Sequence, residues 1–410
     1  MKKLAALMMA VLLCLSLAAC GGGSSSGGGK ETKAAEVVDV TVTVWGPQED
    51  QSDDNGKWLQ TQCEAFNEAH PEWNITFNYG VCSEGDAKTN IGTDPSAGAD
   101  VYLFANDQIP DLIKTGGIAE LGGSTLDAIK ANNSETTVNT VTYEGSVYGV
   151  PFTGNTWFMY YDKSVFSEDD IKSLDAMLEK GKVAFPLDNS WYIASFYVAN
   201  GCTLFGEDGG DAAAGFDFSG DKAVQVTEYL VDLVANKNFA NGDVGTNADA
   251  KAFFSGTWDY QKALDAYGDN LGIAASPSIT INGELKQMKS FAGSKAVGVN
   301  PATALYGEHP EVAVALAAYL GGTEAQQAHY DLRNIIPTDN NITVDDALAQ
   351  AQMDTMAYAS IVQPLQADMG NYWGPAESMG KELVAGTVTH KNAAKKTEAM
   401  NESLNTSAVQ

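Results

Sequence analysis

Residues Val38 to Pro47 read Val-Asp-Val-Thr-Val-Thr-Val-Trp-Gly-Pro, and this stretch decides the fold class. Valine alternates with Asp or Thr, as in a β-strand, and Trp-Gly-Pro ends the pattern. Apolar residues at spacings of four and three between 59 and 66 predict a helix, and strand patterns follow at 74–79 and 99–105. This order is typical of the start of a parallel α/β sheet.

A second α/β pattern follows the first. About 375 residues remain after the N-terminal segments described below, which favours two domains. The predicted elements are an extended stretch at 146–161, strands at 182–187, 271–280 and 291–300, helices at 191–200 and 223–234, and a helix that begins at Pro310 and ends at Gly321. The last 65 residues predict helices only.

The N-terminus has the pattern of a lipoprotein signal peptide. An apolar run follows Lys2 and Lys3 and closes in Leu17-Ala18-Ala19-Cys20. The run is too short for a membrane span and lacks charges that would stop transfer. We expect residues 1–19 to be removed, Cys20 to carry lipid and residues 20–37 to form a Gly/Ser tether, with a plain secretory signal as the alternative. This places the protein on the extracellular face of the cell membrane, in a Gram-positive bacterium.

The charge of the chain excludes several classes of partner. The formal net charge is −29 and becomes −31 without Lys2 and Lys3, so neither nucleic acid nor an anionic lipid surface is expected as a partner. Arg333 is the only arginine, and arginine is the usual clamp for phosphate and carboxylate ligands. In an exported protein Cys63 and Cys82 could form a disulfide, although free buried thiols fit the sequence equally well.

Motifs for catalysis are absent from the sequence. The four histidines are scattered without metal-ligand spacing, and no nucleophile elbow, P-loop or dinucleotide fingerprint occurs. We therefore expect no catalytic residues, no metal and no cofactor. A glycoside hydrolase stays open, because its two carboxylates need not be close in sequence.

Tryptophans in polar turns are the strongest functional signal. Trp45, Trp191, Trp258 and Trp373 follow strands or lie among Gly, Asn and Asp residues. Ligands of open α/β sheets bind beyond the carboxyl ends of strands. A pyranose has an apolar face that stacks on a ring and a belt of hydroxyls that Asn, Asp and Gln satisfy. The pattern predicts a carbohydrate cleft.

These segments resemble those of a known family from Val38 onward. The strand ending in Trp45-Gly46-Pro47-Gln48-Glu49, the segment 100–107, the crossing strand 148–163, the turn 188–192, the loop 256–258 and Trp373 are similar to the maltose-binding protein group of extracellular solute-binding proteins that feed ABC importers. The resemblance implies a two-lobed α/β periplasmic-binding-protein-like fold of type II, with a ligand cleft between lobes joined by a multi-strand hinge. It implies an N-terminal lobe of residues 38–153 plus 297–338 and a C-terminal lobe of 154–296 plus 339–410.

The resemblance also implies the residues of the cleft. Those expected to bind ligand are Trp45, Gln48, Glu49, Phe104, Asn106, Asp107, Asn155, Asn189, Trp191, Tyr192, Trp258, Tyr372 and Trp373. The best-known member of the family has glutamates where Asn155 and Asn189 stand, an arginine at Gln108 and a Trp at Phe104. Trp157 is expected to pack in the core.

The function implied is capture of an oligosaccharide for an ABC importer. Maltooligosaccharides such as maltose and maltotriose are favoured, while xylo-, galacto- and fructo-oligosaccharides stay open. The implied partners are the importer's membrane permease subunits, and the protein is expected to be a monomer. The alternatives are a cell-surface glycan-binding or glycoside hydrolase lipoprotein, and a peptide-binding protein, for which Arg333 is a poor carboxylate clamp.

Overall fold

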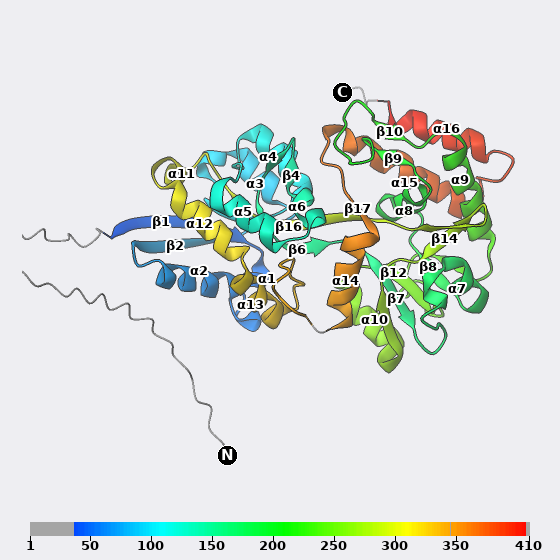
Figure 1. Ribbon diagram of the computed structural model, residues 1–410, viewed down its shortest axis with the longest axis horizontal. Coiled ribbons are helices and arrows are strands. Elements are labelled where there is room, and N and C mark those ends of the chain that lie inside the picture. The colour runs from blue at the N-terminus through cyan, green and yellow to red at the C-terminus, as the bar shows by residue number, and fades with distance from the viewer. Residues whose placement is uncertain (1–36, 345, 407–410) are drawn as a thin grey trace, which may run out of the picture.

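The computed structural model describes residues 37–344 and 346–406 and has two lobes (Figure 1). The core of the N-lobe comes mainly from residues 40–152 and 296–325, and that of the C-lobe from 157–291 and 336–404. The predicted α/β character is confirmed, whereas residues 1–36, with the leader, Cys20 and most of the tether, lie outside the described residues. No helix within the described ranges is long and apolar enough to cross a membrane.

The elements alternate between strands and helices along most of the chain. The strands are β1 (Val38–Gly46), β2 (Trp73–Val81), β3 (Val101–Ala105), β4 (Thr142–Tyr143), β5 (Ser146–Val147), β6 (Val150–Asn155), β7 (Phe158–Asp162), β8 (Val183–Phe185), β9 (Thr203–Leu204), β10 (Phe216–Asp217), β11 (Phe239–Asn241), β12 (Ala252–Ser255), β13 (Leu271–Ala274), β14 (Ser278–Ile281), β15 (Glu284–Gln287), β16 (Ser290–Val299) and β17 (Ser360–Val362). The α-helices are α1 (Gln48–Gln51), α2 (Trp58–Ala69), α3 (Ala87–Thr93), α4 (Ile109–Thr115), α5 (Gly123–Asn132), α6 (Glu135–Thr140), α7 (Leu174–Lys180), α8 (Ser190–Ala199), α9 (Gly220–Ala235), α10 (Tyr260–Tyr267), α11 (Ala304–Glu308), α12 (Pro310–Leu320), α13 (Thr323–Arg333), α14 (Ala347–Tyr358), α15 (Gly370–Val384) and α16 (Ala393–Leu404).

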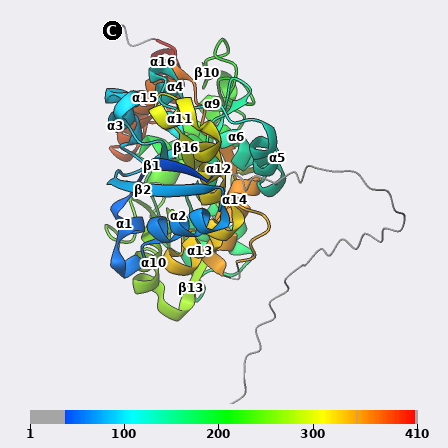
Figure 2. The ribbon, with the colours of Figure 1, turned by 90° about the vertical axis from the view of Figure 1, so that its left-hand side faces the viewer.

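The sheet of the N-lobe has its first three strands in parallel. Its order is β17-β16-β3-β1-β2, with β6 also paired to β16. β1 pairs with β2 from Val38 and Trp73 to Gly46 and Val81, and with β3 at its other edge. The carboxyl ends of these strands therefore meet at one edge, and Figure 2 shows helices above and below the strands.

The second sheet belongs to the C-lobe and has the order β11-β8-β12-β7-β13. β8 is parallel to β11 and β12, while β7 is antiparallel to β12 and β13. Helices α8, α15, α16 and α9 pack against one another in this lobe. The turn that follows β8 leads into α8, and Tyr372 of α15 donates to the carbonyl of Ser190 there.

Strand β16 links the two lobes. Its first residues, 290–292, pair with β17, residues 293–297 pair with β6, and residues 295–299 pair with β3. Every residue except Lys295 is buried. The chain also passes between the cores after β6 and between α13 and α14, so three segments join the lobes. The lobe boundaries 38–153, 297–338, 154–296 and 339–410 stay predictions.

A buried carboxylate fastens the short helix α1 to α13. Asp50 is fully buried, and its Oδ1 contacts the guanidinium of Arg333. His329 Nε2 lies 2.7 Å from the same oxygen and donates to it, since an ionised carboxylate only accepts. The imidazole stacks on Trp58 with ring centroids 4.0 Å apart.

Three expectations about local structure are now settled. The last 65 residues are not all helical, because Ser360–Val362 form β17 against β16. Cys63, Cys82 and Cys202 are free and buried, so the possible disulfide is not formed. Trp157 is fully buried as expected, stacked on Tyr192 with centroids 5.1 Å apart.

We expect Asp50→Asn to destabilise the protein at neutral pH by about 3 kcal/mol, because removing one partner of a buried ion pair leaves the others unpaired. Burial alone would raise the pKa of Asp50, but the hydrogen bond and charge of His329, together with Arg333, hold it below the ordinary 3.8. A lowered pKa gives stability that is complete above 3.8 and lost as pH falls through the folded-state value. Urea unfolding should therefore show a wild-type advantage that shrinks only in that acidic range; an advantage independent of pH would contradict this.

Candidate functional site

Polar side chains gather where the parallel strands of the N-lobe end. Gln48 and Glu49 follow β1 and are exposed, and Trp45 at the end of that strand is half-buried. Asn106 and Asp107 follow β3, with Asn106 buried and Asp107 exposed. The structure therefore brings the predicted residues of β1 and β3 to one edge, as parallel pairing requires.

A hollow of about 240 Å³ unites three of the predicted residues. Asn106 and Asp107 line it together with Asn155, the last residue of β6, whose register partner on β16 is Gly293. Gln363, which follows β17, completes one wall. Strands of the N-lobe and segments that join the lobes thus border the same space.

Buried amides hold this edge in shape. Asn106 donates from Nδ2 to the carbonyl of Thr140 at 2.8 Å and accepts from the backbone N–H of Ser294 through Oδ1 at 2.8 Å. Gln108 donates to the carbonyls of Glu84 and Gly85 at 2.8 and 2.7 Å. Asn106 and Gln108 therefore support the walls of the hollow, and Gln108 is not available to a ligand.

The carboxyl group of Asp107 at this edge has a raised pKa. The residue keeps exposed surface, but surrounding protein atoms weaken the solvation of its carboxyl group and raise its pKa above 3.8, while Lys88 acts in the opposite direction. The ammonium of Lys88 is paired with Asp111 at 2.9 Å. Asp107 therefore offers an acceptor to a neutral ligand.

Aromatic rings form a second group on the C-lobe. Trp191 is the second residue of α8 and lies near Trp258, with centroids 5.9 Å apart. Trp258 is 54% exposed. Asn189 caps α8 by accepting from the N–H of Trp191 at 2.9 Å. Trp373 is half-buried and packs edge-on against Phe291 and Tyr372.

Three predicted aromatic contact residues, like Asn106 above, are buried and need correction. Phe104 is fully buried, because its ring fills the space beside Gly149 and Gly298 under the strands that lead to the hinge. Tyr372 is fully buried among aromatic rings and donates to the carbonyl of Ser190 at 2.8 Å. Tyr192 is 7% exposed and stacked on Trp157. Tyr372 supports the turn that carries Trp191 and does not line a cleft.

Glycines lie beneath the half-buried ring of Trp45 and the exposed ring of Trp258. A Cβ at Gly80 would lie 2.3 Å from Cδ1 of Trp45, and one at Gly256 would lie 2.1 Å from Cζ3 of Trp258. Real Cβ atoms do not approach that closely, so only glycine lets these rings lie flat on the backbone. The rings are therefore fixed by the chain beneath them.

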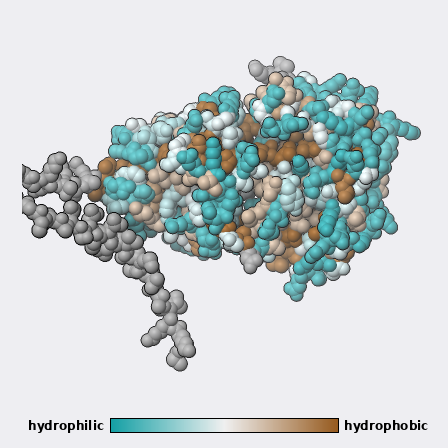
Figure 3. Space-filling model, in the orientation of Figure 1, coloured by the Kyte–Doolittle hydropathy of each residue, from teal (hydrophilic) through white to brown (hydrophobic). Residues whose placement is uncertain are grey.

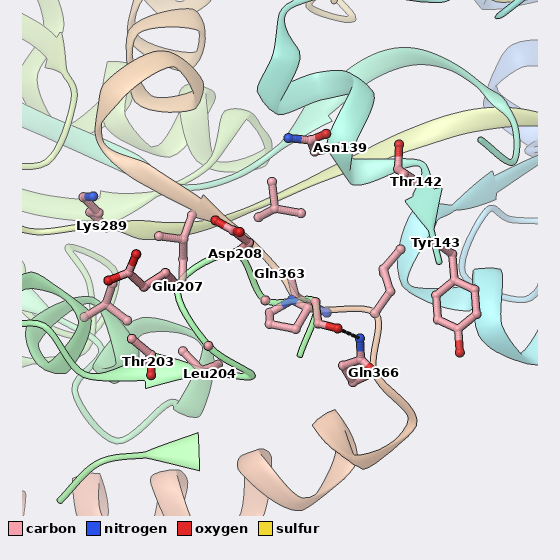
Figure 4. A pocket seen from close by; sticks show the side chains of 18 of the residues that line it. Asn139, Thr142, Tyr143, Thr203, Leu204, Glu207, Asp208, Lys289, Gln363 and Gln366 are labelled. Atoms are coloured by element: carbon pink, nitrogen blue, oxygen red, sulfur yellow. Dashed lines mark hydrogen bonds between the residues drawn. The ribbon is translucent and has the colours of Figure 1, made fainter. Parts of the chain in front are cut away.

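A larger hollow lies elsewhere. It measures about 870 Å³ and is bordered by residues 142–145 of the N-lobe, the loop 203–210 of the C-lobe and the segment 361–366 (Figure 4). Gln366 donates to the carbonyl of Gly210 at 3.2 Å across it. Hydrophobic side chains gather between the lobes on the face shown in Figure 3. Tyr143 is the only aromatic residue that lines this hollow of about 870 Å³, and none of the predicted binding residues lines it. The size of a hollow alone therefore does not identify the site.

Residues missed by sequence reasoning also border the site. Glu84 lies three residues after the last residue of β2, Val81, and the rule that ligands bind beyond strand ends could have found it. It pairs with Lys295 of β16 at 3.1 Å. No sequence signal could have found Gln363, because the three-residue β17 before it was taken as helix.

No hydrogen bond or ring contact between described residues joins the polar group of the N-lobe to the aromatic group of the C-lobe. The expected contact of both groups with one ligand stays a prediction. No three His, Cys, Asp or Glu side chains in the described part are grouped to hold a metal.

Comparisons with known proteins agree with this architecture. Residues 61–356 match the family of bacterial extracellular solute-binding proteins. The maltodextrin-binding protein MdxE of Bacillus subtilis is 24% identical over 72% of this chain and 75% of its own. A structure described as "with acarbose" is 49% identical, with a TM-score of 0.78 over 90% of this chain and 99% of that one. The unliganded maltodextrin-binding protein MalE1 of L. casei, at 24% identity, has a TM-score of 0.82 over 90% of this chain and all of its own. The two-lobed type II fold is thereby confirmed.

We expect Gly256→Ala to displace the ring of Trp258 without unfolding the C-lobe, because the backbone of residue 256 accepts alanine and the ring has solvent beside it. In the protein labelled with fluorotryptophan, the fluorine resonances of Trp258 and its neighbour Trp191 should shift while those of the other five tryptophans stay. Gly307→Ala, where a Cβ meets nothing within 4 Å, is the matched control. Unchanged resonances in the Gly256 variant would show that the ring is not seated on residue 256.

Proposed function

The chain belongs to the family of bacterial extracellular solute-binding proteins, and we propose that it captures maltooligosaccharides such as maltose and maltotriose for an ABC importer. The observation that carries the proposal is the pair of neighbouring rings of Trp191 and Trp258, half-exposed beside polar side chains. Such rings stack on the apolar face of a pyranose, and the amides and carboxylates at the strand ends accept and donate to its hydroxyls.

The choice of α-glucans rests on relatives. MdxE of Bacillus subtilis is named for maltodextrin, a Pyrococcus abyssi relative is named for maltotriose, and the structure at 49% identity is described with acarbose. A binding protein for another oligosaccharide is the second candidate, because Asn155 and Asn189 differ from the glutamates of the best-known member. A surface glycoside hydrolase is disfavoured for the same reason, since amides replace carboxylates at these two positions.

The proposed cycle uses the three segments that join the lobes. In the open form, sugar stacks on Trp191 and Trp258 of the C-lobe. Rotation about the segments near residues 153, 296 and 337 then brings the N-lobe edge, with Trp45, Glu49 and Asp107, onto the sugar. The sugar favours the closed form only through the extra contacts made there, and the permease subunits recognise that form.

The proposed location of the protein rests on the lipoprotein signal pattern at the N-terminus. We propose that Cys20 carries the lipid, that the tether up to residue 37 leaves the lobes free above the membrane, and that the protein works as a monomer on the outer face of a Gram-positive cell. The net negative charge disfavours nucleic acid as a partner.

The proposal predicts that residues 31–410 bind maltotriose with micromolar or tighter affinity in isothermal titration and leave it intact by thin-layer chromatography. Absence of heat with maltotriose would move the assignment to xylo-, galacto- or fructo-oligosaccharides. Cleavage of the sugar would overturn the transport function.

Trp258→Ala and Trp191→Ala should each weaken binding by about 1–3 kcal/mol, the value of burying one large apolar side chain. Both rings have exposed or half-exposed surface, so the melting temperature should change little. Tyr143→Ala, at the hollow of about 870 Å³, is the control and should bind as the wild type does. If only the control lost affinity, the site would lie in that hollow.

Cys20→Ser should release the protein from the membrane, because the thiol that would carry the lipid is absent. Detergent-phase partitioning of cells that express each form checks this. A variant that still partitions into detergent would exclude the anchor at residue 20.

A further inference from the structure

We propose that Arg333 and His329 are positioning residues for ligand binding: through Asp50 they hold helix α1 so that Gln48 and Glu49 face the sugar. The inference rests on the proposed function, because it assigns Gln48 and Glu49 to the site.

Helix α1 cannot hold its own position. It spans four residues, Gln48–Gln51, and a single turn is unstable without tertiary contacts. Its first two side chains are exposed, so they contribute no packing. The anchors are Gln51, which donates to the carbonyls of Gly46 and Gly80 at 2.8 and 3.0 Å, and the buried Asp50. Asn55 and Ser52 also donate to the carbonyl of Glu49, at 3.0 and 3.2 Å, but Asp50 and Gln51 are the side chains of α1 itself that fasten it to the rest of the N-lobe.

The anchor at Asp50 is sensitive to loss of a partner. Its carboxylate is fully buried, and only Oδ1 is engaged, by Arg333 and by His329. Oδ2 of Asp50 and Nδ1 of His329 are buried with no hydrogen-bond partner. Loss of the guanidinium would leave a buried charge with one partner in place of two, and α1 would have to move to hydrate it.

The same helix that holds Asp50 is fixed to the segments that join the lobes. Gln326 of α13 accepts from the N–H groups of Thr338 and Asp339 at 2.8 and 3.1 Å and donates to the carbonyl of Pro151 at 3.3 Å. His329 lies 5.6 Å from Phe152 of β6 by ring centroids. α1 is therefore oriented relative to the hinge.

A small cavity connects the anchor with the site. It holds about 110 Å³, and its lining includes Glu49, Glu84 and Lys295 together with His329 and Arg333. Arg333, which is 19% exposed, thus lies beside the residue it is proposed to orient. Because Arg333 has a partner in Asp50, it acts on ligand through α1.

The test is a thermodynamic cycle on the chain from residue 31 onward, which contains every described residue. Arg333→Met should weaken maltotriose binding about tenfold, the lower end of what a hydrogen bond to a charged group contributes, and Arg333→Lys should lose less. In a Gln48→Ala/Glu49→Ala background, Arg333→Met should give no further loss of affinity, although the fall in melting temperature should be the same in both backgrounds. Lys180→Met, which removes the partner of the little-exposed Asp170 in the C-lobe, should leave affinity unchanged.

Two results of the binding cycle would overturn the proposal. One is an equal loss of affinity in both backgrounds, since Arg333 would then act without α1; the other is a lower melting temperature with unchanged affinity, which would mean a purely structural role. Hydrogen exchange of the peptide 46–58 needs no sugar. It should accelerate in Arg333→Met and not in Lys180→Met, and unchanged exchange would also overturn the proposal. Failure of the wild type to bind maltotriose, with exchange as expected, would instead refute the proposed sugar.

Discussion

The hydrogen-bonded ladder of β16 is the constraint on which the other features depend. This ten-residue strand pairs with β17, β6 and β3, and it is buried along its length except at Lys295. Because β3 lies beside β1 in the same sheet, the strand ends that carry Trp45 and Asp107 are fixed relative to the hinge. A rigid strand shared by two cores lets the lobes rotate as bodies while the walls of the site keep their shape. In the proposed function the site is assembled from two preformed halves, and the free energy of binding depends on how these halves are oriented.

The sequence was informative where a pattern has one physical interpretation. Alternation from Val38 to Val44 predicted β1, which the structure confirms, whereas the role of Asp107 in ligand binding, implied by the family resemblance, stays a prediction. The sequence did not predict which side chains of a fully buried strand lack solvent contact. A strand buried on both faces has no alternation of polar and apolar residues, so the pattern does not show that the side chain of Phe104 is buried. The prediction that Tyr372 contacts ligand was wrong for a related reason. The sequence does not distinguish a tyrosine hydroxyl that donates to a backbone carbonyl from one that donates to a ligand.

Long-range polar pairs were beyond prediction. Asp50 and Arg333 are 283 residues apart in the chain, and neither has a local pattern that names its partner. β17 was missed because three residues, Ser360–Val362, are too few for a period and because they gain their hydrogen bonds only from β16. The need for glycine at positions 80 and 256 was also not predictable, because it comes from the rings of Trp45 and Trp258, which the tertiary fold places against these residues. Over most of this chain, the secondary structure that local propensity predicts is the one that tertiary packing stabilises. At the candidate site, tertiary packing decides positions that local propensity does not predict.

The position of the lone arginine has a chemical consequence. Because the only guanidinium of 410 residues lies in the contact between α1 and α13, every other permanent side-chain cation of the molecule is a lysine amine. Amine-directed reagents therefore modify the outside of the protein without touching this contact. A dicarbonyl selective for guanidinium has a single target, which is partly accessible at the wall of a small cavity. Modification of Arg333 by such a reagent therefore reports on one contact, that between α1, which carries Gln48 and Glu49, and α13, which is bonded to the segments that join the lobes.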